Sequence, residues 1–333
     1  MRAAIAWTLL PWLLLPAAST ADESPMLTLE TLAEGVYAFR PTEESQTSWR
    51  AVSNSGAVVL DDGVLIYDSH WSPVQVQEAQ RLLRTKTDKP IRYVIHSHFH
   101  LDHSGGAGVY GPEVEQISHH ATRNRLVEQV AALPERLPRQ IEGLERQLAA
   151  AESDADRLLA ENILRSSRAL KARIDAGDTG LSTLTFDHSL IFHRRPTLEL
   201  HFLGRGHTDG DAILYLPDEK VIFLGDLFWV RMLPNVSDGF TLEWIETLEA
   251  VLELDATRYV PGHGAVGDAE DVRELVGYLR WLRSAVEPFV KEGKGVEAAQ
   301  AGVELPEVYA DYLFQNHLAP GIAKVYGEIE AGR

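Results

Sequence analysis

The chain has 333 residues, of which 45% are hydrophobic and 24% charged, a composition that excludes collagen-like, low-complexity and multispan membrane proteins. Its 31 Lys and Arg residues against 49 Asp and Glu residues give a net charge of −18, which disfavours nucleic acid as the main partner. With 0 Cys, the chain has no disulfides, thiolate zinc sites or cysteine nucleophiles, so attention falls on its 13 His residues.

The first predicted segment is a secretory signal peptide at residues 1–21. Arg2 precedes an apolar stretch over residues 3–18, and three small residues then come before Asp22. The apolar stretch is broken by two prolines and is short for a membrane span, and no later stretch reaches such a length. We therefore expect a secreted or periplasmic protein with no stable membrane insertion after cleavage; an uncleaved anchor is the less favoured alternative.

Residues 22–120 and 181–267 are predicted to form the two halves of one domain of the α/β or α+β class. Extended segments fill residues 27–67, where Asp61-Asp62-Gly63 separates two apolar runs as in a β-hairpin. Residues 74–85 show helical periodicity. Further short strands are predicted at residues 91–95, 198–203, 212–216 and 221–224. Strands mixed with helices in this way are typical of sheets covered by outer helices.

Residues 121–180 differ from the rest because they show no strand pattern. Apolar residues recur at helical spacing, and ten basic residues balance ten acidic ones. This pattern predicts two or three amphipathic helices, inserted as a hairpin that is either a solvated appendage or a lid or wall of a binding cleft. Residues 268–333 are predicted to form C-terminal helices that pack on the domain.

The motif His-x-His-x-Asp-His follows the predicted strand at residues 91–95. Alternate residues leaving a strand point to the same side, so His98 and His100 can converge on one ion, while Asp102 and His103 can turn toward a second ion. Neutral imidazole and carboxylate are ligands of catalytic Zn²⁺, which keeps one position open for water. The motif therefore predicts a metal centre.

Three further candidate ligands stand beside glycines at the ends of later strands. They are His207 in Gly-Arg-Gly-His-Thr, Asp226 in Leu-Gly-Asp and His263 in Pro-Gly-His-Gly. Glycine lets the backbone bend so that such side chains can face a shared rim. Each motif is weak alone, but their combination favours a metal centre over unrelated core or surface positions.

The order of these motifs resembles the metallo-β-lactamase-fold superfamily of hydrolases over residues 27–264, with the helical block as an interruption. The resemblance implies a four-layer αββα sandwich with its site along one edge. It also implies two Zn²⁺ per chain and this division of ligands: His98, His100 and His207 for the first ion, Asp102, His103 and His263 for the second, and Asp226 bridging both. Asp68 matches the position of an acid that orients a ligand histidine, and Asp211 is expected to have a structural hydrogen-bonding role.

Such a centre implies an exported hydrolase in which a metal-bound hydroxide attacks the carbonyl of a small-molecule substrate, with Asp102 and Asp226 as catalytic residues. Asp102 would position the hydroxide and relay a proton. The stretch around His207 is similar to secreted zinc β-lactamases, so β-lactam hydrolysis, and with it a role in antibiotic resistance, is the leading single named activity.

Two departures from that β-lactamase subclass keep other activities open. Asp226 stands where the subclass has a ligand Cys, as in glyoxalase-II-like thioesterases and lactonases. Trp229 stands where the subclass has a basic residue for the substrate carboxylate, and Arg231 is the nearest cation in the sequence. A mononuclear-iron persulfide dioxygenase and a non-catalytic zinc-binding periplasmic protein are alternatives of other classes. The oligomeric state is left open.

Overall fold

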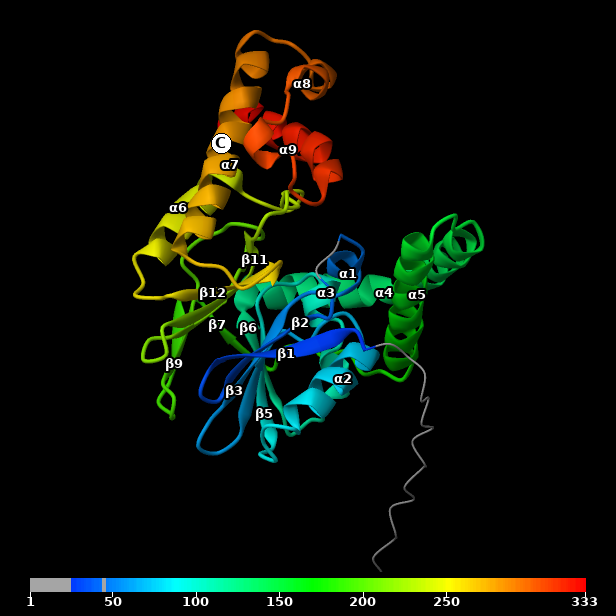
Figure 1. Cartoon of the computed structure of the whole chain (residues 1–333), viewed down its shortest axis with the longest axis vertical. Helices are drawn as coiled ribbons and strands as arrows, with labels where there is room; N and C mark the ends of the chain where they lie inside the picture. Colours follow the sequence, from blue (N-terminus) through cyan, green and yellow to red (C-terminus); the bar gives the residue numbers. More distant parts are fainter. Residues whose placement is uncertain (1–24, 44–45) are drawn as a thin grey trace, which may run out of the picture.

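The computed structural model describes residues 25–43 and 46–333, so the predicted signal peptide lies outside the described residues. The described strands form two sheets (Figure 1). The first sheet contains, in spatial order, β1 (Leu27–Ala33), β2 (Val36–Pro41), β3 (Ser55–Val59), β4 (Val64–Tyr67), β5 (Ile91–His96), β6 (Glu115–His119) and β7 (Leu184–Phe186). The second contains β12 (Arg258–His263), β11 (Val221–Trp229), β10 (Ile213–Leu216), β9 (Leu198–His201) and β8 (Ser189–Phe192).

Both sheets are mixed. Strands β1 to β4 pair antiparallel and β4 to β7 pair parallel, whereas in the second sheet only β11 and β12 are parallel. The predicted hairpin around Asp61-Asp62-Gly63 is confirmed, since β3 and β4 pair from Val59 with Val64 to Gly56 with Tyr67. The parallel pairs bring the carboxyl ends of their strands to one edge, where loops can meet.

The helices complete the outer layers and the two ends of the molecule. They are α1 (Gln46–Ala51), α2 (Pro73–Leu83), α3 (Leu101–Ser104), α4 (His120–Ala149), α5 (Asp154–Asp175), α6 (Thr241–Leu252), α7 (Ala269–Lys291), α8 (Val296–Gly302) and α9 (Leu318–Glu330). Short 3-10 helices lie at residues 107–109, 307–309 and 315–317. None of the helices in the described part of the chain has both the length and the apolar character that a bilayer crossing requires.

Three apolar clusters hold the layers together. The central one joins the inner faces of the two sheets, for example Val58 and Ile95 of the first with Leu214 and Phe223 of the second. A second cluster packs α2 on the outer face of the first sheet. A third packs α6 and α7 on the outer face of the second sheet. The four-layer αββα sandwich predicted from the sequence is therefore confirmed.

The region predicted to be a helical insertion contains the hairpin of α4 and α5, which stands at one side of the sandwich (Figure 1). Helix α4 is longer than its periodicity indicated, because it begins at His120 and continues through Pro134 and Pro138. Proline removes a helical hydrogen bond, but Leu133 and Leu137 between and beside the prolines are completely buried. Their packing keeps the segment helical.

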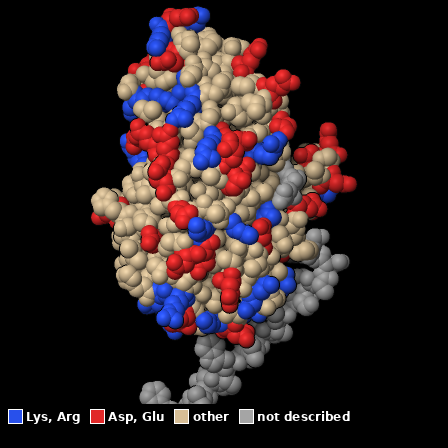
Figure 2. Space-filling model, turned by 60° about the vertical axis from the view of Figure 1, so that its left-hand side comes forward, with Lys and Arg blue, Asp and Glu red and all other residues tan. Residues whose placement is uncertain are grey.

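The structure differs from the sequence analysis in three short elements. Helix α1 interrupts the region expected to be extended, and its Trp49 is buried with Trp229 and Phe314. The strands β7 and β8, of three and four residues, were not predicted. Among the C-terminal helices, α7 packs on α6 and β11 of the sandwich, and α8 and α9 pack on one another and on α7 (Figure 1). Acidic and basic side chains are interspersed over the face shown in Figure 2.

Candidate metal centre

The seven side chains predicted as ligands meet at one edge of the sandwich, in two groups that share Asp226. His98, His100, Asp102 and His103 come from the segment between β5 and the end of α3. His207 follows β9, Asp226 lies in β11 and His263 ends β12. The groups are His98, His100, His207 and Asp226, and Asp102, His103, Asp226 and His263; within each group the ligand atoms lie within 4.8 Å of one another.

The Asp226 carboxylate presents one oxygen to each group. Its Oδ2 lies 3.4 Å from His207 Nε2 and 3.9 Å from His98 Nε2. Its Oδ1 lies 3.1 Å from His103 Nε2 and 3.5 Å from His263 Nε2. This geometry is suited to a carboxylate that bridges two cations.

Two glycines let the strands carry these ligands so close together. Gly225 precedes Asp226 with a φ of +53°, and a Cβ there would lie 2.7 Å from the Ser97 side chain. Gly262 precedes His263, and a Cβ there would lie 1.9 Å from Asp226 Oδ1. Any larger residue at these two positions would therefore collide with the site, which explains the glycines beside Asp226 and His263.

Asp68 contacts the ligand His103, the kind of contact that the resemblance implied for this acid. Its Oδ1 accepts a hydrogen bond from the Ser97 backbone N–H (2.8 Å), and its Oδ2 accepts from Ser97 Oγ and from His103 Nδ1 (both 2.8 Å). Ser97 Oγ also lies 2.9 Å from His98 Nδ1. These contacts leave the Nε2 atoms of His98 and His103 directed at the site, and such partners fix the tautomer of a ligand imidazole.

A second acid of this kind, Asp238, lies in the loop between β11 and α6 and was not predicted from the sequence. Its Oδ2 accepts a hydrogen bond from His100 Nε2 (2.9 Å), while His100 Nδ1 lies 2.9 Å from His207 Nε2. No motif marks Asp238, because it is 138 residues from its partner. Asp211 accepts from the Thr208 N–H and hydroxyl (2.8 and 2.6 Å), which confirms its structural role.

Burial and neighbouring charges adjust these groups toward cation binding. Burial, followed by the charges of His103 and His100, holds the pKa of His98 well below its ordinary value, and burial lowers the pKa of His207 to about 3. Both imidazoles are therefore neutral, the form that binds metals. Burial would raise the pKa of Asp226, but the charges of His103 and His263 outweigh it and lower that pKa.

The pKa of His103 is shifted in the opposite direction to those of His98 and His207. Burial would lower its pKa, but the carboxylates of Asp226, Asp102 and Asp68 outweigh burial and raise it well above the ordinary value. Three carboxylates around one buried imidazole favour positive charge at this point. A metal cation would supply that charge in place of a proton.

The buried atoms without hydrogen-bond partners test whether a metal fits. Among the described residues these atoms include His98 Nε2, His103 Nε2 and Asp226 Oδ1. Buried polar atoms are rarely left unpaired, since each costs free energy. These three belong to the two ligand groups, and imidazole nitrogen with carboxylate oxygen is a donor set of zinc. The residues therefore fit a pair of divalent cations.

Aromatic side chains form one wall of the site. The Trp229 ring lies against the His263 ring, with centroids 4.5 Å apart, and its Nε1 donates to the Asp226 carbonyl oxygen (2.9 Å). Phe314 packs behind Trp229, and Arg50 lies over the Phe314 ring at 5.8 Å. Arg231, the cation nearest in sequence, is instead held in an ion pair with Asp311.

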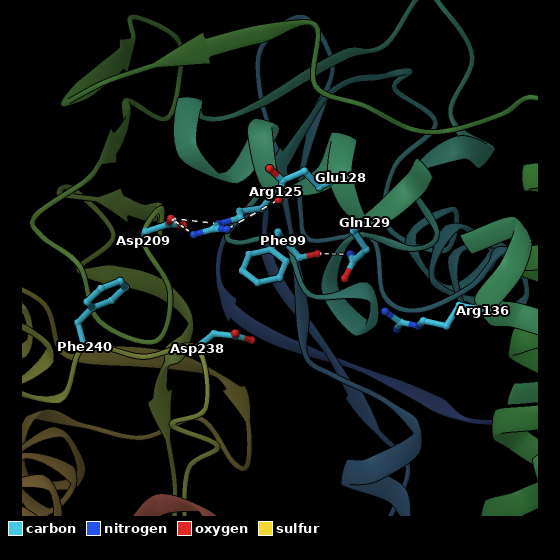
Figure 3. A pocket seen from close by; sticks show the side chains of 8 residues that line it. All are labelled: Phe99, Arg125, Glu128, Gln129, Arg136, Asp209, Asp238 and Phe240. Atoms are coloured by element: carbon cyan, nitrogen blue, oxygen red, sulfur yellow. Dashed lines mark hydrogen bonds and ion pairs between the residues drawn. The ribbon is translucent and has the colours of Figure 1, made fainter. Parts of the chain in front are cut away.

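A cavity of about 350 Å³ opens beside His100, on the side of α4 (Figure 3). Two of its lining residues touch His100 directly, because the Phe99 and His100 ring centroids are 4.6 Å apart and Asp238 accepts the His100 hydrogen bond. The full lining is Phe99, Arg125, Glu128, Gln129, Arg136, Asp209, Asp238 and Phe240. The cavity is therefore separated from the His100 imidazole by Phe99 and Asp238, the two lining residues that contact that ring.

Known proteins with similar sequences include members of the metallo-beta-lactamase superfamily. The sequence profile of the metallo-beta-lactamase superfamily matches residues 49–113 and 178–263, on either side of the α4–α5 hairpin. The chain is 25% identical over 209 residues to the alpha subunit of 2,4-dinitroanisole O-demethylase from Nocardioides sp. (strain JS1661), covering 62% of this chain. The chain spans about half the length of that subunit (51%).

Two further comparisons cover more of the chain. It is 25% identical over 253 residues to the metallo-beta-lactamase type 2 of Bacillus sp. (strain 170), covering 74% of this chain and 80% of the relative. Among solved structures, a metallo-beta-lactamase from Pontibacter korlensis superposes with a TM-score of 0.54 at 19% identity, over 76% of this chain and 99% of the other. At that identity the superposition shows a shared fold.

Proposed function

Because residues 49–113 and 178–263 match the metallo-beta-lactamase superfamily, we propose that the chain is a member of this superfamily and a dinuclear zinc hydrolase that cleaves a carbonyl compound. The observation that carries the proposal is the position of Asp226, with one carboxylate oxygen toward each ligand group. His98, His100 and His207 would hold one ion, Asp102, His103 and His263 the other, and Asp226 both.

The chain's own residues would orient the reaction. When bound, two zinc ions supply Lewis acidity for the carbonyl oxygen and lower the pKa of water to about 7. Asp102 is 26% exposed, against 4% for Asp226, so it is the more accessible of the two carboxylates. Its Oδ2 is 3.1 Å from His263 Nε2. The greater exposure of Asp102 supports a role in which it would hold the attacking water and accept its proton.

The relatives and two residues of the site bear on the substrate class. Relatives described as metallo-beta-lactamases support a β-lactam as the leading single substrate. Asp226 in place of a ligand Cys, and Trp229 in place of a basic residue, favour an ester, a lactone or a thioester. We propose a carbonyl hydrolase whose substrate belongs to one of these four classes.

A hydrolysis screen on protein of known metal content tests the proposal. We expect two zinc ions per chain by mass spectrometry of the metal, and turnover of at least one substrate when a carbapenem, a lactone, an ester and a thioester are assayed side by side. Removal of zinc with a chelator should abolish the turnover and its return should restore it. One iron per chain with persulfide oxidation, or two zinc ions without any turnover, would contradict the proposal.

We also propose that the protein is exported, on the basis of residues 1–21. The N-terminus of the protein recovered from the periplasm of an expressing Gram-negative host is expected near Asp22, because the small residues before it are suited to signal cleavage. Sequencing of that N-terminus checks the prediction, and recovery of chains that begin at Met1 would contradict it.

A further inference from the structure

One face of helix α4 is attached to both loops that carry histidines of the metal centre. Thr122 Oγ1 donates to the Gly210 carbonyl oxygen (2.6 Å), and Arg125 Nη2 lies 2.8 Å from Asp209 Oδ2; both partners follow His207. One turn further along, Gln129 Nε2 donates to the carbonyl oxygen of Phe99 (2.6 Å), the residue between His98 and His100. Residues 122, 125, 129 and 136 are spaced so that they share one face of the helix.

A small apolar core holds the α4–α5 hairpin against the segment that carries His100 and Asp102. Leu133 and Leu137 of α4 and Leu170 of α5 pack against Leu101, the residue between His100 and Asp102. All four side chains are buried. The position of α4 relative to the metal centre is therefore set by packing as well as by hydrogen bonds, as a preformed binding wall requires.

Most charged groups that line the cavity already have partners. Arg125 pairs with Asp209 (2.8 Å) and with Glu128 (3.7 Å). Asp238 is bound to His100. Within the part of the chain that the structure describes, Arg136 has no hydrogen bond or ion pair, and Figure 3 shows its guanidinium directed from α4 into the cavity. It is thus the lining cation that remains available for a ligand.

We propose that Arg136 binds a carboxylate of the substrate, so that the substrate is a carbonyl compound with a second, anionic end. This inference rests on the proposed hydrolase function. The proposal requires that a molecule whose reacting carbonyl lies at the metal centre reaches past Phe99, which touches His100, to the cavity that Arg136 lines. The planar guanidinium can bind a carboxylate through two hydrogen bonds. On the opposite side of the centre, Arg231 is already paired with Asp311.

Two esters with the same leaving group test the proposal. They are the 4-nitrophenyl monoester of adipic acid, which ends in a carboxylate, and 4-nitrophenyl hexanoate, which ends in a methyl group. We expect Arg136→Met to lower kcat/KM for the adipate ester by ~10-fold, mainly through KM, because one charge-assisted contact is lost. Hydrolysis of the hexanoate should stay within about twofold of the wild type, because the variant keeps the apolar length of the side chain.

Two matched variants sharpen the result. Arg139→Met alters an exposed arginine of the same helix that does not line the cavity, and it should behave as the wild type. Arg50→Met removes the cation beyond Trp229 and Phe314, on the other wall of the centre. If Arg50→Met, rather than Arg136→Met, abolishes the preference for the adipate ester, or if Arg136→Met slows both esters equally, the proposal is wrong although the hydrolase function stands.

Direct binding separates this proposal from the proposed function. Calorimetric titration of the purified zinc-loaded protein with adipate should give a Kd that Arg136→Met weakens by ~10-fold and Arg139→Met leaves unchanged. Adipate that only chelates the metal would bind the wild type and Arg136→Met equally, which would overturn the proposal. Since the titration needs no turnover, it tests the role of Arg136 even if neither ester is hydrolysed.

Discussion

Replacement of Asp226 by Asn is expected to abolish hydrolysis and to lower the zinc content to one ion per chain or fewer, while the protein stays folded. The amide keeps the size of the carboxylate but removes its negative charge, and it offers only one acceptor oxygen to the two ligand groups. With Asp226 Oδ2 facing His207 and Oδ1 facing His103, one group must lose the oxygen that Asp226 supplies to it. We expect kcat/KM to fall by at least ~10³-fold, since metal-assisted catalysis is lost.

The measurements are zinc per chain, kcat/KM for the best substrate of the screen, and the thermal unfolding midpoint. Asp218→Asn is the matched control, because Asp218 is exposed in the turn that leads into the same strand, β11. The control should keep the wild-type zinc content and rate. Two zinc ions and full activity in Asp226→Asn would show that the ligand assignment is incorrect.

Asp68→Asn is expected to weaken zinc binding by about 10- to 100-fold without removing any proposed ligand. The carboxylate of Asp68 accepts three hydrogen bonds, from the Ser97 N–H, Ser97 Oγ and His103 Nδ1. An amide has one acceptor oxygen, so its NH₂ group must face either the Ser97 N–H or the N–H of His103, donor against donor. Asp68 has a φ of +63°, which Asn tolerates, so the backbone can remain in place.

Competition with a chromogenic chelator measures this loss of zinc affinity. Because Asp68 acts through His103, excess zinc should restore most of the turnover in Asp68→Asn, whereas it should not rescue Asp226→Asn. Asp62→Asn, in the exposed turn between β3 and β4, serves as the control. Unchanged zinc affinity in Asp68→Asn would mean that the contact with His103 has no part in metal binding.

The seven candidate ligands were predictable because each stands in a short local motif. The strand end expected at residue 224 was wrong, since β11 continues past Asp226 to Trp229. The spacing in His-x-His-x-Asp-His and the glycines beside His207, Asp226 and His263 are local signals, readable without knowledge of the fold. Asp238 and Arg136 have no such signal. Asp238 is identified only by its contact with His100, 138 residues away, and Arg136 only by the cavity that it lines.

The same distinction applies to the fold. The apolar alternation of β3 and β4 and the turn between them predict their pairing locally, and the structure confirms it. Helix α4 could not be bounded in this way, because Pro134 and Pro138 are local helix breakers. Contacts of Leu133 and Leu137 with residues distant in sequence outweigh that preference. Helix α1 likewise depends on the distant partners of Trp49.

The two ligand groups draw on both halves of the sandwich in equal measure. Each takes two side chains from the segment after β5, in the first sheet, and two from the strands or loops of the second. Cations held there would connect the two sheets at the end of the sandwich opposite the turn between β3 and β4. Substitutions that shift one sheet relative to the other would then impair metal binding and catalysis at a smaller displacement than unfolding requires.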